Sequence, residues 1–188
     1  MVVHGLGSGR VDHRDYAVRL AAAGINALAL DLRGHGDSGG TTDAGMVDDV
    51  IAALDWLVGE GAGPLGVRGS SLGGFLALNA AARHPSVRAI AAICPAQQDG
   101  LADNRGLTWA LDMPLQDAVA RDDEIARGYW HATGDELVPW SWSQQLFARS
   151  PHPRHLRIVL GGHHRSLQHD PAVQAETVTF LQHHLSGE

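Results

Sequence analysis

The chain has 188 residues, a formal net charge of −7, and a composition that is 44% hydrophobic and 19% charged. These values predict one globular domain over residues 1–188 and exclude a disordered chain. An acidic chain without a basic run lacks the positive surface that nucleic acid or an anionic membrane would need, so we expect a small-molecule partner.

The cysteine content and the N-terminus bear on the cellular location. The chain contains one cysteine, Cys94, which excludes an internal disulfide and favours a reducing compartment, the cytoplasm. The first residues lack the charged start and apolar core of a signal peptide. No stretch approaches the roughly 20 apolar residues of a membrane span, so we expect no membrane insertion.

Short β-rich runs alternate with helical patterns along the chain. The runs that we expect to form strands are residues 2–3, 26–30, 65–67, 87–94, 129–132 and 156–160. Such alternation predicts an α/β fold, with a mostly parallel sheet of about six strands and helices on both faces.

Two helices have clear boundaries in the sequence. Asp43 can cap a helix whose apolar positions between 47 and 58 fall on one face, and the glycines at 59–61 end it. The second helix begins at Asp170-Pro171, a capping residue followed by a proline at the first helical position, and continues to the C-terminus. Both helices should pack against the sheet.

A Gly-Ser-Ser-Leu-Gly string at 69–73 follows the expected strand at 65–67 and precedes a helix-prone run. This matches G-x-S-x-G in the strand, turn and helix context that exposes a serine nucleophile, here Ser71. Read alone, the string could be an ordinary loop. Because Ser71 would lie at the N-terminus of the following helix, the helix dipole also favours negative charge there.

A serine hydroxyl needs a base, and the base needs an acid to orient it. Asp135 follows one expected strand and His164 follows the next, so both should lie at the carboxyl edge of the sheet near Ser71. Glu136 is the rival acid and His163 the rival base, and we favour Asp135 and His164. A cluster of His163, His164, His169 and Asp170 could instead bind a metal, although its spacing matches no known ligand pattern, and we expect none.

Acyl transfer also requires donors for the developing oxyanion. We expect the backbone N–H of Leu72, directly after the nucleophile, and that of Leu6, in the glycine turn His4-Gly5-Leu6-Gly7 after the first strand. The turn also begins a dinucleotide-binding G-x-G-x-x-G pattern. That pattern fails at Arg10, where its third glycine belongs, so we expect no cofactor.

Residues 97–123 break the alternation of strands and helices, and we expect them to form a small cap-like insertion. Trp109, Trp130, Trp140 and Trp142 gather around this insertion and the acid loop. We expect Trp130 to pack in the core, and Trp109 or Trp140 to contact the substrate.

With the His-Gly turn, the string Asp-Leu-Arg-Gly-His-Gly-Asp-Ser at 31–38, the Ser71 elbow, and the Asp135 and His164 loops all in order, the chain resembles the α/β-hydrolase superfamily. It is most similar to the small serine esterases and dienelactone-hydrolase-like members. The resemblance implies a serine hydrolase that cleaves carboxylic esters through an acyl-enzyme. It also implies that the 31–38 string is structural.

The chain departs from this family in two ways. Members usually carry one or two strands before the His-Gly turn, whereas this sequence begins inside that strand, so we expect a fold with its N-terminal strands missing. If Met1 is the true start, the run at 26–30 is an exposed sheet edge, which predicts a homodimer. The second departure is that 97–123 is too short for a large lid, which predicts an open acyl pocket and short-chain esters.

Other functions fit the same residues. Peptidase, thioesterase, lactonase and acyltransferase activities use the same triad, and a ligand receptor with little turnover can keep the fold. An epoxide or haloalkane hydrolase would need a carboxylate at the elbow and a typical dienelactone hydrolase a cysteine, so Ser71 argues against these.

Overall fold

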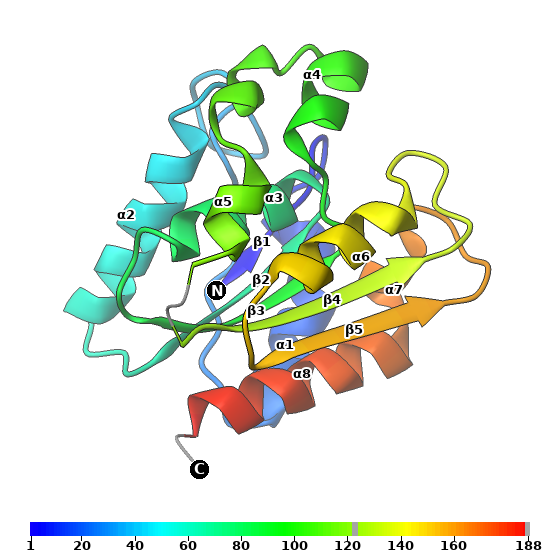
Figure 1. The fold of residues 1–188 in the computed structure, drawn as a ribbon. Coiled ribbons are helices and arrows are strands. Elements are labelled where there is room, and N and C mark those ends of the chain that lie inside the picture. Colours follow the sequence, from blue (N-terminus) through cyan, green and yellow to red (C-terminus); the bar gives the residue numbers. More distant parts are fainter. Residues whose placement is uncertain (122–123, 187–188) are drawn as a thin grey trace.

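A parallel sheet forms the centre of the molecule. The computed structural model describes residues 1–121 and 124–186. Within these residues the sheet has five strands in the spatial order β1-β2-β3-β4-β5, all parallel to their neighbours (Figure 1). The strands are β1 Val2–Val3, β2 Leu65–Ser70, β3 Val87–Ile93, β4 Ala126–Ala132 and β5 Arg154–Val159.

The prediction of a sixth strand at 26–30 is wrong. This segment runs beside β1, where Ala29 makes an isolated parallel bridge to Val2 and the Val2 N–H donates to the Leu28 carbonyl at 2.8 Å. Because β1 has only two strand residues, it offers this segment only a short ladder. The edge of the sheet therefore ends in a single bridge.

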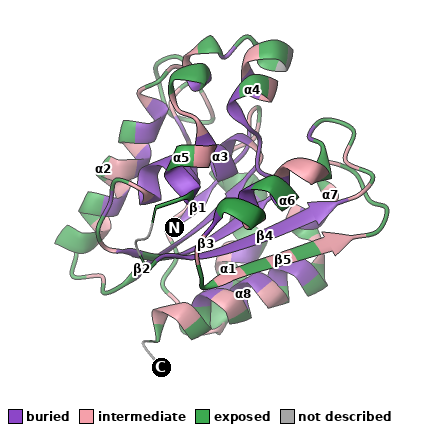
Figure 2. Ribbon diagram, in the orientation of Figure 1, coloured by how far each residue is buried: buried purple, intermediate pink, exposed green. Residues whose placement is uncertain are grey.

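Helices cover both faces of the sheet, as predicted. One face carries α2 Met46–Gly59, α3 Leu72–Ala81, α5 Leu115–Val119 and α6 Trp140–Arg149. The other face carries α1 Arg14–Ala22, α7 Ser166–His169 and α8 Pro171–Leu185. Two apolar cores result, one on each side of the strands. Figure 2 shows the central strands buried, while the outer surfaces of α2 and α8 are exposed.

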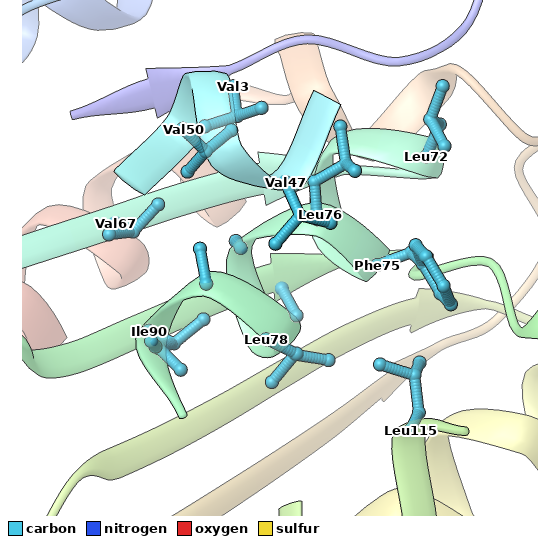
Figure 3. Close-up of a cluster of buried hydrophobic side chains, with 14 of the residues drawn as sticks. Val3, Val47, Val50, Val67, Leu72, Phe75, Leu76, Leu78, Ile90 and Leu115 are labelled. Atoms are coloured by element: carbon cyan, nitrogen blue, oxygen red, sulfur yellow. The ribbon is translucent and has the colours of Figure 1, made fainter. Parts of the chain in front are cut away.

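Helix α3 lies at the centre of the larger core. Each of its ten residues is buried, because the helix is enclosed by the sheet, α2 and α5. Figure 3 shows Leu76 of α3 near Val47 and Val50 of α2, and Phe75 near Leu115 of α5. This enclosure fixes the position of the helix whose first turn follows Ser71.

The predicted end of α2 at Gly59 and the predicted cap of α8 are confirmed, but Asp43 is not the cap of α2. The N-cap residue of α2 is Gly45, without a side-chain cap, and the Asp43 carboxylate accepts from the Gly45 N–H at 2.9 Å in the turn before the helix. The Asp170 carboxylate caps α8 by accepting from the N–H groups of Ala172 and Val173, both at 2.9 Å. The bonds to Asp170 satisfy amides that a helix N-terminus otherwise leaves without partners.

The segment expected as a small insertion forms three short helices, α4 Gln98–Arg105, η2 Thr108–Asp112 and α5. Residues 122–123, at its predicted end, lie outside the described residues. Over the described part of the chain, no helix has both the length and the apolar character to cross a bilayer.

A buried histidine lies on the face of the sheet that α1 covers. His13, from η1 Arg10–His13, is 1% exposed, and neither ring nitrogen has a hydrogen-bond partner. Burial, with the nearby positive charge of Arg68 and the rings of His169 and His4, lowers the pKa of His13 to about 4, against a smaller opposite effect of Asp12. The folded state therefore resists protonation of this ring.

This histidine predicts acid sensitivity. The unfolded chain takes up a proton on His13 as the pH falls through about 6.5, whereas the folded chain does so only near pH 4, so stability decreases across this window. We expect a loss on the order of 2 kcal/mol between pH 7 and pH 5. Urea unfolding at both pH values should show a smaller loss in His13→Leu. The exposed His183→Leu serves as control, and equal losses in all three proteins would contradict the prediction.

Candidate active site

A strained turn presents Ser71 at the carboxyl edge of the sheet. β2 ends at Ser70, α3 begins at Leu72, and Ser71 between them has φ 54° and ψ −118°. A side chain in this region of backbone conformation costs roughly 1–3 kcal/mol, so the surroundings must hold it. The Ser71 N–H donates to the Ile93 carbonyl at 2.9 Å, and its own carbonyl accepts from the Ala96 N–H at 3.1 Å.

Two glycines allow the elbow to pack closely. A Cβ on Gly69 would lie 2.2 Å from the carbonyl oxygen of Gly73, and one on Gly73 would lie 2.2 Å from that of Val3. The turn is therefore pressed against both the start of α3 and β1. Since these contacts are with backbone atoms, a side chain at either position would have to displace the chain itself.

We predict that Gly73→Ala destabilises the fold by roughly 1–3 kcal/mol or prevents folding, because the methyl group overlaps the Val3 carbonyl. Gly59→Ala is the matched control, since nothing lies within 4 Å of a Cβ there. Thermal unfolding followed by circular dichroism measures both. Equal melting temperatures for the two variants would contradict this packing.

The structure brings Ser71, His164 and Asp135 together. His164 Nε2 lies 2.9 Å from Ser71 Oγ, and His164 Nδ1 lies 2.7 Å from Asp135 Oδ2. Asp135 follows β4 and His164 follows β5, so the parallel strands deliver both side chains to one edge of the sheet. This arrangement can pass a proton from the serine hydroxyl to the imidazole.

The two rival residues have other contacts. His163 Nδ1 accepts from the Arg165 N–H at 3.3 Å in an exposed loop, where the ring braces its own turn. The Glu136 carboxylate is exposed and accepts from the backbone N–H of His164 at 3.2 Å. Neither side chain has a hydrogen bond to Ser71 among the described residues.

The Asp135 carboxylate is held in its charged form. Its side chain is fully buried, which by itself disfavours the charge, but hydrogen bonds from His131, from His164 and from the Val138 N–H keep its pKa well below the ordinary value. A charged Asp135 opposite His164 favours the imidazolium that proton transfer from a serine would create.

The glycine turn after β1 lies against the elbow. A Cβ on Gly5 would lie 3.3 Å from the Ser71 Cβ, and Leu6 lines a small hollow together with Ser71 and His164. Leu72 is the first residue of α3, so its N–H belongs to the amides without an intrahelical acceptor. Both expected oxyanion donors therefore lie on segments that adjoin Ser71.

His4 braces this turn, a role that the sequence did not reveal. Its Nδ1 must carry the proton, because it lies 2.7 Å from the Gly5 carbonyl, and its Nε2 accepts from the Leu32 N–H at 3.0 Å. Burial lowers the pKa of His4 and so favours this neutral form. The 31–38 string thus contacts the glycine turn through the Leu32 N–H and the His4 ring. This contact fits the structural role expected for the string.

A cleft of about 440 Å³ opens at Ser71. Its lining residues are Ser71, Ala96, Gly100, Leu101, Arg105, Asp135, Glu136, Leu137, Val138, Pro139, Trp142 and His164. α4 and the acid loop therefore form much of its wall, and the smaller hollow adjoins it, since the two share Ser71, Leu101, Arg105, Leu137 and His164.

The tryptophan that lines the cleft is Trp142, and neither Trp109 nor Trp140 is among the lining residues. Trp109 packs on Phe75, with ring centroids 6.2 Å apart. Trp140 is 37% exposed at the start of α6. Positions two apart on a helix point in nearly opposite directions, so Trp142 turns inward where Trp140 turns outward.

Possible metal ligands are already engaged in other contacts. Cys94, His131 and Asp135 present ligand atoms within 4.8 Å of one another. However, His131 Nε2 lies 3.0 Å from the Val138 carbonyl, which requires a proton on that nitrogen, and burial raises the pKa of the Cys94 thiol. The cluster therefore has the character of a hydrogen-bonded core. Asp170, from the metal site considered in the sequence, caps α8 instead.

The sequence of the chain is similar to those of known proteins. The sequence model of the family described as serine aminopeptidase, S33, matches residues 1–121. A pimeloyl-[acyl-carrier protein] methyl ester esterase of Neisseria meningitidis is 38% identical over 84 residues, covering 45% of this chain and 31% of that protein. An uncharacterized protein of Mycobacterium tuberculosis is 26% identical over 176 residues, covering 87% and 62%. The chain thus spans under a third of the first relative and 62% of the second.

Solved structures share the fold. A monoacylglycerol lipase of Paleococcus ferrophilus has a TM-score of 0.79 at 18% identity, covering 100% of this chain and 93% of that one. An esterase of Pyrococcus furiosus has a TM-score of 0.81 at 21% identity, covering 98% and 80%. At these identities the likeness concerns the fold, and it confirms the predicted α/β-hydrolase architecture.

Proposed function

We propose that this chain, which belongs to the serine aminopeptidase S33 family of α/β-hydrolases, hydrolyses carboxylic esters with Ser71 as nucleophile. The observation that carries the proposal is the continuous contact from Ser71 Oγ to His164 at 2.9 Å and from His164 to Asp135 at 2.7 Å. A hydroxyl on a strained turn beside an oriented base is the arrangement that nucleophilic catalysis requires.

The mechanism follows from these contacts. Ser71 Oγ attacks the ester carbonyl while His164 Nε2 takes its proton, and Asp135 stabilises the imidazolium. The tetrahedral intermediate collapses, the C–O bond to the alcohol breaks, and His164 returns the proton to the departing alkoxide. Water, deprotonated by His164, then attacks the acyl-enzyme, and collapse of the second intermediate releases the acid and restores the Ser71 hydroxyl.

The oxyanion of each intermediate needs donors that are in place beforehand. The N–H groups of Leu72 and Leu6 are the candidates, and each such donor is worth about 3 kcal/mol in comparable enzymes. Because α3 is enclosed on all sides and the glycine turn is braced by His4, neither amide has to reorganise during the reaction.

An ester is the favoured substrate for two reasons. The cleft is walled by short helices and a loop, which leaves Ser71 open to a small acyl group. In addition, the Neisseria relatives are named for hydrolysis of a methyl ester, although this chain matches less than a third of their length.

The first experiment measures hydrolysis of p-nitrophenyl acetate, butyrate and octanoate together with labelling by a fluorophosphonate. We expect Ser71→Ala and His164→Ala to lose activity by a factor on the order of 10⁴ or more, and Ser71→Ala to lose labelling as well. His163→Ala is the matched control and should retain both.

The outcomes separate the alternatives. A folded wild type that neither labels nor turns over would refute the proposal and favour a ligand receptor. Labelling with turnover of an aminoacyl p-nitroanilide but of no ester would instead assign a peptidase on the same residues.

The charge of the cleft suggests an acyl preference. Arg105, at the end of α4, lines both the cleft and the smaller hollow, and Arg165 lines the hollow beside His164. Within the described chain, the Arg105 guanidinium has no hydrogen bond or ion pair, whereas Arg10 and Arg33 are each paired with aspartates. Arg105 is therefore available to a substrate carboxylate.

We predict that an ester of adipic acid with one free carboxylate is hydrolysed with a lower KM than the hexanoate ester of equal length. Arg105→Gln should raise the KM for the adipate roughly two- to fivefold and leave the hexanoate unaffected, which is the size of an exposed ion pair. The remote, exposed Arg19→Gln is the control. If Arg105→Gln changes both substrates equally, the carboxylate preference is wrong.

A further inference from the structure

A second histidine, His131, lies on the same carboxylate as His164. It belongs to β4, four residues before Asp135, and its side chain is fully buried. His131 Nε2 lies 3.2 Å from Asp135 Oδ2 and 3.0 Å from the Val138 carbonyl oxygen, and Nδ1 lies 2.7 Å from the hydroxyl of Ser143 in α6. The ring therefore links the acid loop to α6.

These contacts determine the tautomer of His131. A carbonyl oxygen can only accept a hydrogen bond, so the Nε2 that faces Val138 carries the proton. In the neutral ring Nδ1 is then an acceptor, and the Ser143 hydroxyl donates to it. Ser143 is itself buried, so its hydroxyl is shielded from bulk solvent.

The Asp135 carboxylate is surrounded by donors on both oxygens. Oδ1 accepts from the N–H groups of Leu137 at 2.9 Å and Val138 at 2.8 Å. Oδ2 lies 2.7 Å from His164 Nδ1 and 3.2 Å from His131 Nε2. Together with the Cys94 thiol, which also hydrogen-bonds to this carboxylate, these groups restrict its rotation.

We propose that His131 is a positioning residue, whose Nε2–H holds Oδ2 of Asp135 toward His164 while Ser143 fixes the tautomer of the His131 ring. His131 does not line the cleft, so it acts through Asp135 and does not contact substrate. The inference rests on the proposed function, because it assigns His131 to the orientation of that same base.

Other titratable or charged side chains also lie near Asp135 and His131. Cys94, at the end of β3, stays a neutral thiol because burial raises its pKa. Glu136 is exposed and contacts the backbone of His164, Arg105 lines the cleft and the smaller hollow, and Arg165 lines the hollow. The Cys94 thiol also hydrogen-bonds to the Asp135 carboxylate, whereas the side chains of Glu136, Arg105 and Arg165 have no hydrogen bond to it in the described residues.

The test compares His131→Leu, His131→Gln and Ser143→Ala with Tyr129→Phe. The glutamine amide can place an N–H near the position of Nε2, whereas leucine cannot. Tyr129 is two residues earlier in β4, is also buried, and shares a hydrogen bond with Ser150 at 2.8 Å, so Tyr129→Phe removes a comparable bond away from Asp135.

We expect His131→Leu to lower kcat/KM roughly ten- to a hundredfold, the size of a lost buried hydrogen bond to a charged group. The acidic limb of its kcat/KM profile should move to lower pH, because the His164 imidazolium loses a correctly oriented carboxylate. His131→Gln should restore the limb and most of the rate, Ser143→Ala should shift the limb partway, and Tyr129→Phe should leave it unchanged.

A second readout does not depend on turnover. The proton between His164 Nδ1 and Asp135 gives a downfield NMR signal, which should weaken or move in His131→Leu and return in His131→Gln. If the signal and the limb stay at their wild-type positions in His131→Leu, or move equally in Tyr129→Phe, the positioning role is overturned. If the wild type hydrolyses no ester, but its downfield signal still weakens or moves in His131→Leu and returns in His131→Gln, the ester hydrolase proposal is refuted and the positioning role is supported.

Discussion

The buried carboxylate of Asp135 is the constraint on which the site depends. A charge inside a protein is unfavourable unless donors surround it, and here two backbone amides and two histidines do so. These donors come from three parts of the structure, since both amides lie in the acid loop, His131 is in β4, and His164 follows β5. The same contacts that make the charge tolerable therefore also align the imidazole with Ser71.

The strained backbone of Ser71, on the other side of the His164 imidazole, also needs stabilisation by its surroundings. Its conformation is stable only because β3, α3 and β1 enclose it, through the carbonyl of Ile93 on one side and the close approach of Gly73 to Val3 on the other. The enclosure also determines the position of the Leu72 amide. The strained conformation of Ser71 and the fixed position of the Leu72 amide thus have one physical source, the dense packing of α3 against the sheet.

The sequence predicted the parts of this arrangement that depend on order along the chain. Ser71, Asp135 and His164 each follow an apolar strand, and parallel strands necessarily deliver such residues to one edge. What it could not predict depends on side-chain direction or on pairing across the fold. Trp140 and Trp142 are chemically alike in the sequence, and only the phase of α6 separates them. His131 reads as an ordinary buried strand residue, because its link to Ser143 joins two elements. The prediction of a sixth strand was wrong because β1 is too short to form a ladder with residues 26–30. The sequence of that segment contains no information on the length of its partner.

The proposed chemistry and the proposed acyl preference involve different parts of the molecule. The side chains proposed to react are held by buried strand ends, where the neighbouring backbone cannot shift without disrupting the core. The cleft wall is formed by α4, an eight-residue helix that contacts the rest of the site partly through Gly100 against the Trp142 indole. A glycine is needed there, since a Cβ would lie 2.5 Å from that ring. Arg105, at the exposed end of the same helix, has no hydrogen bond or ion pair with Ser71, His164 or Asp135 among the described residues, so the proposed acyl preference can change without altering the contacts of those three residues.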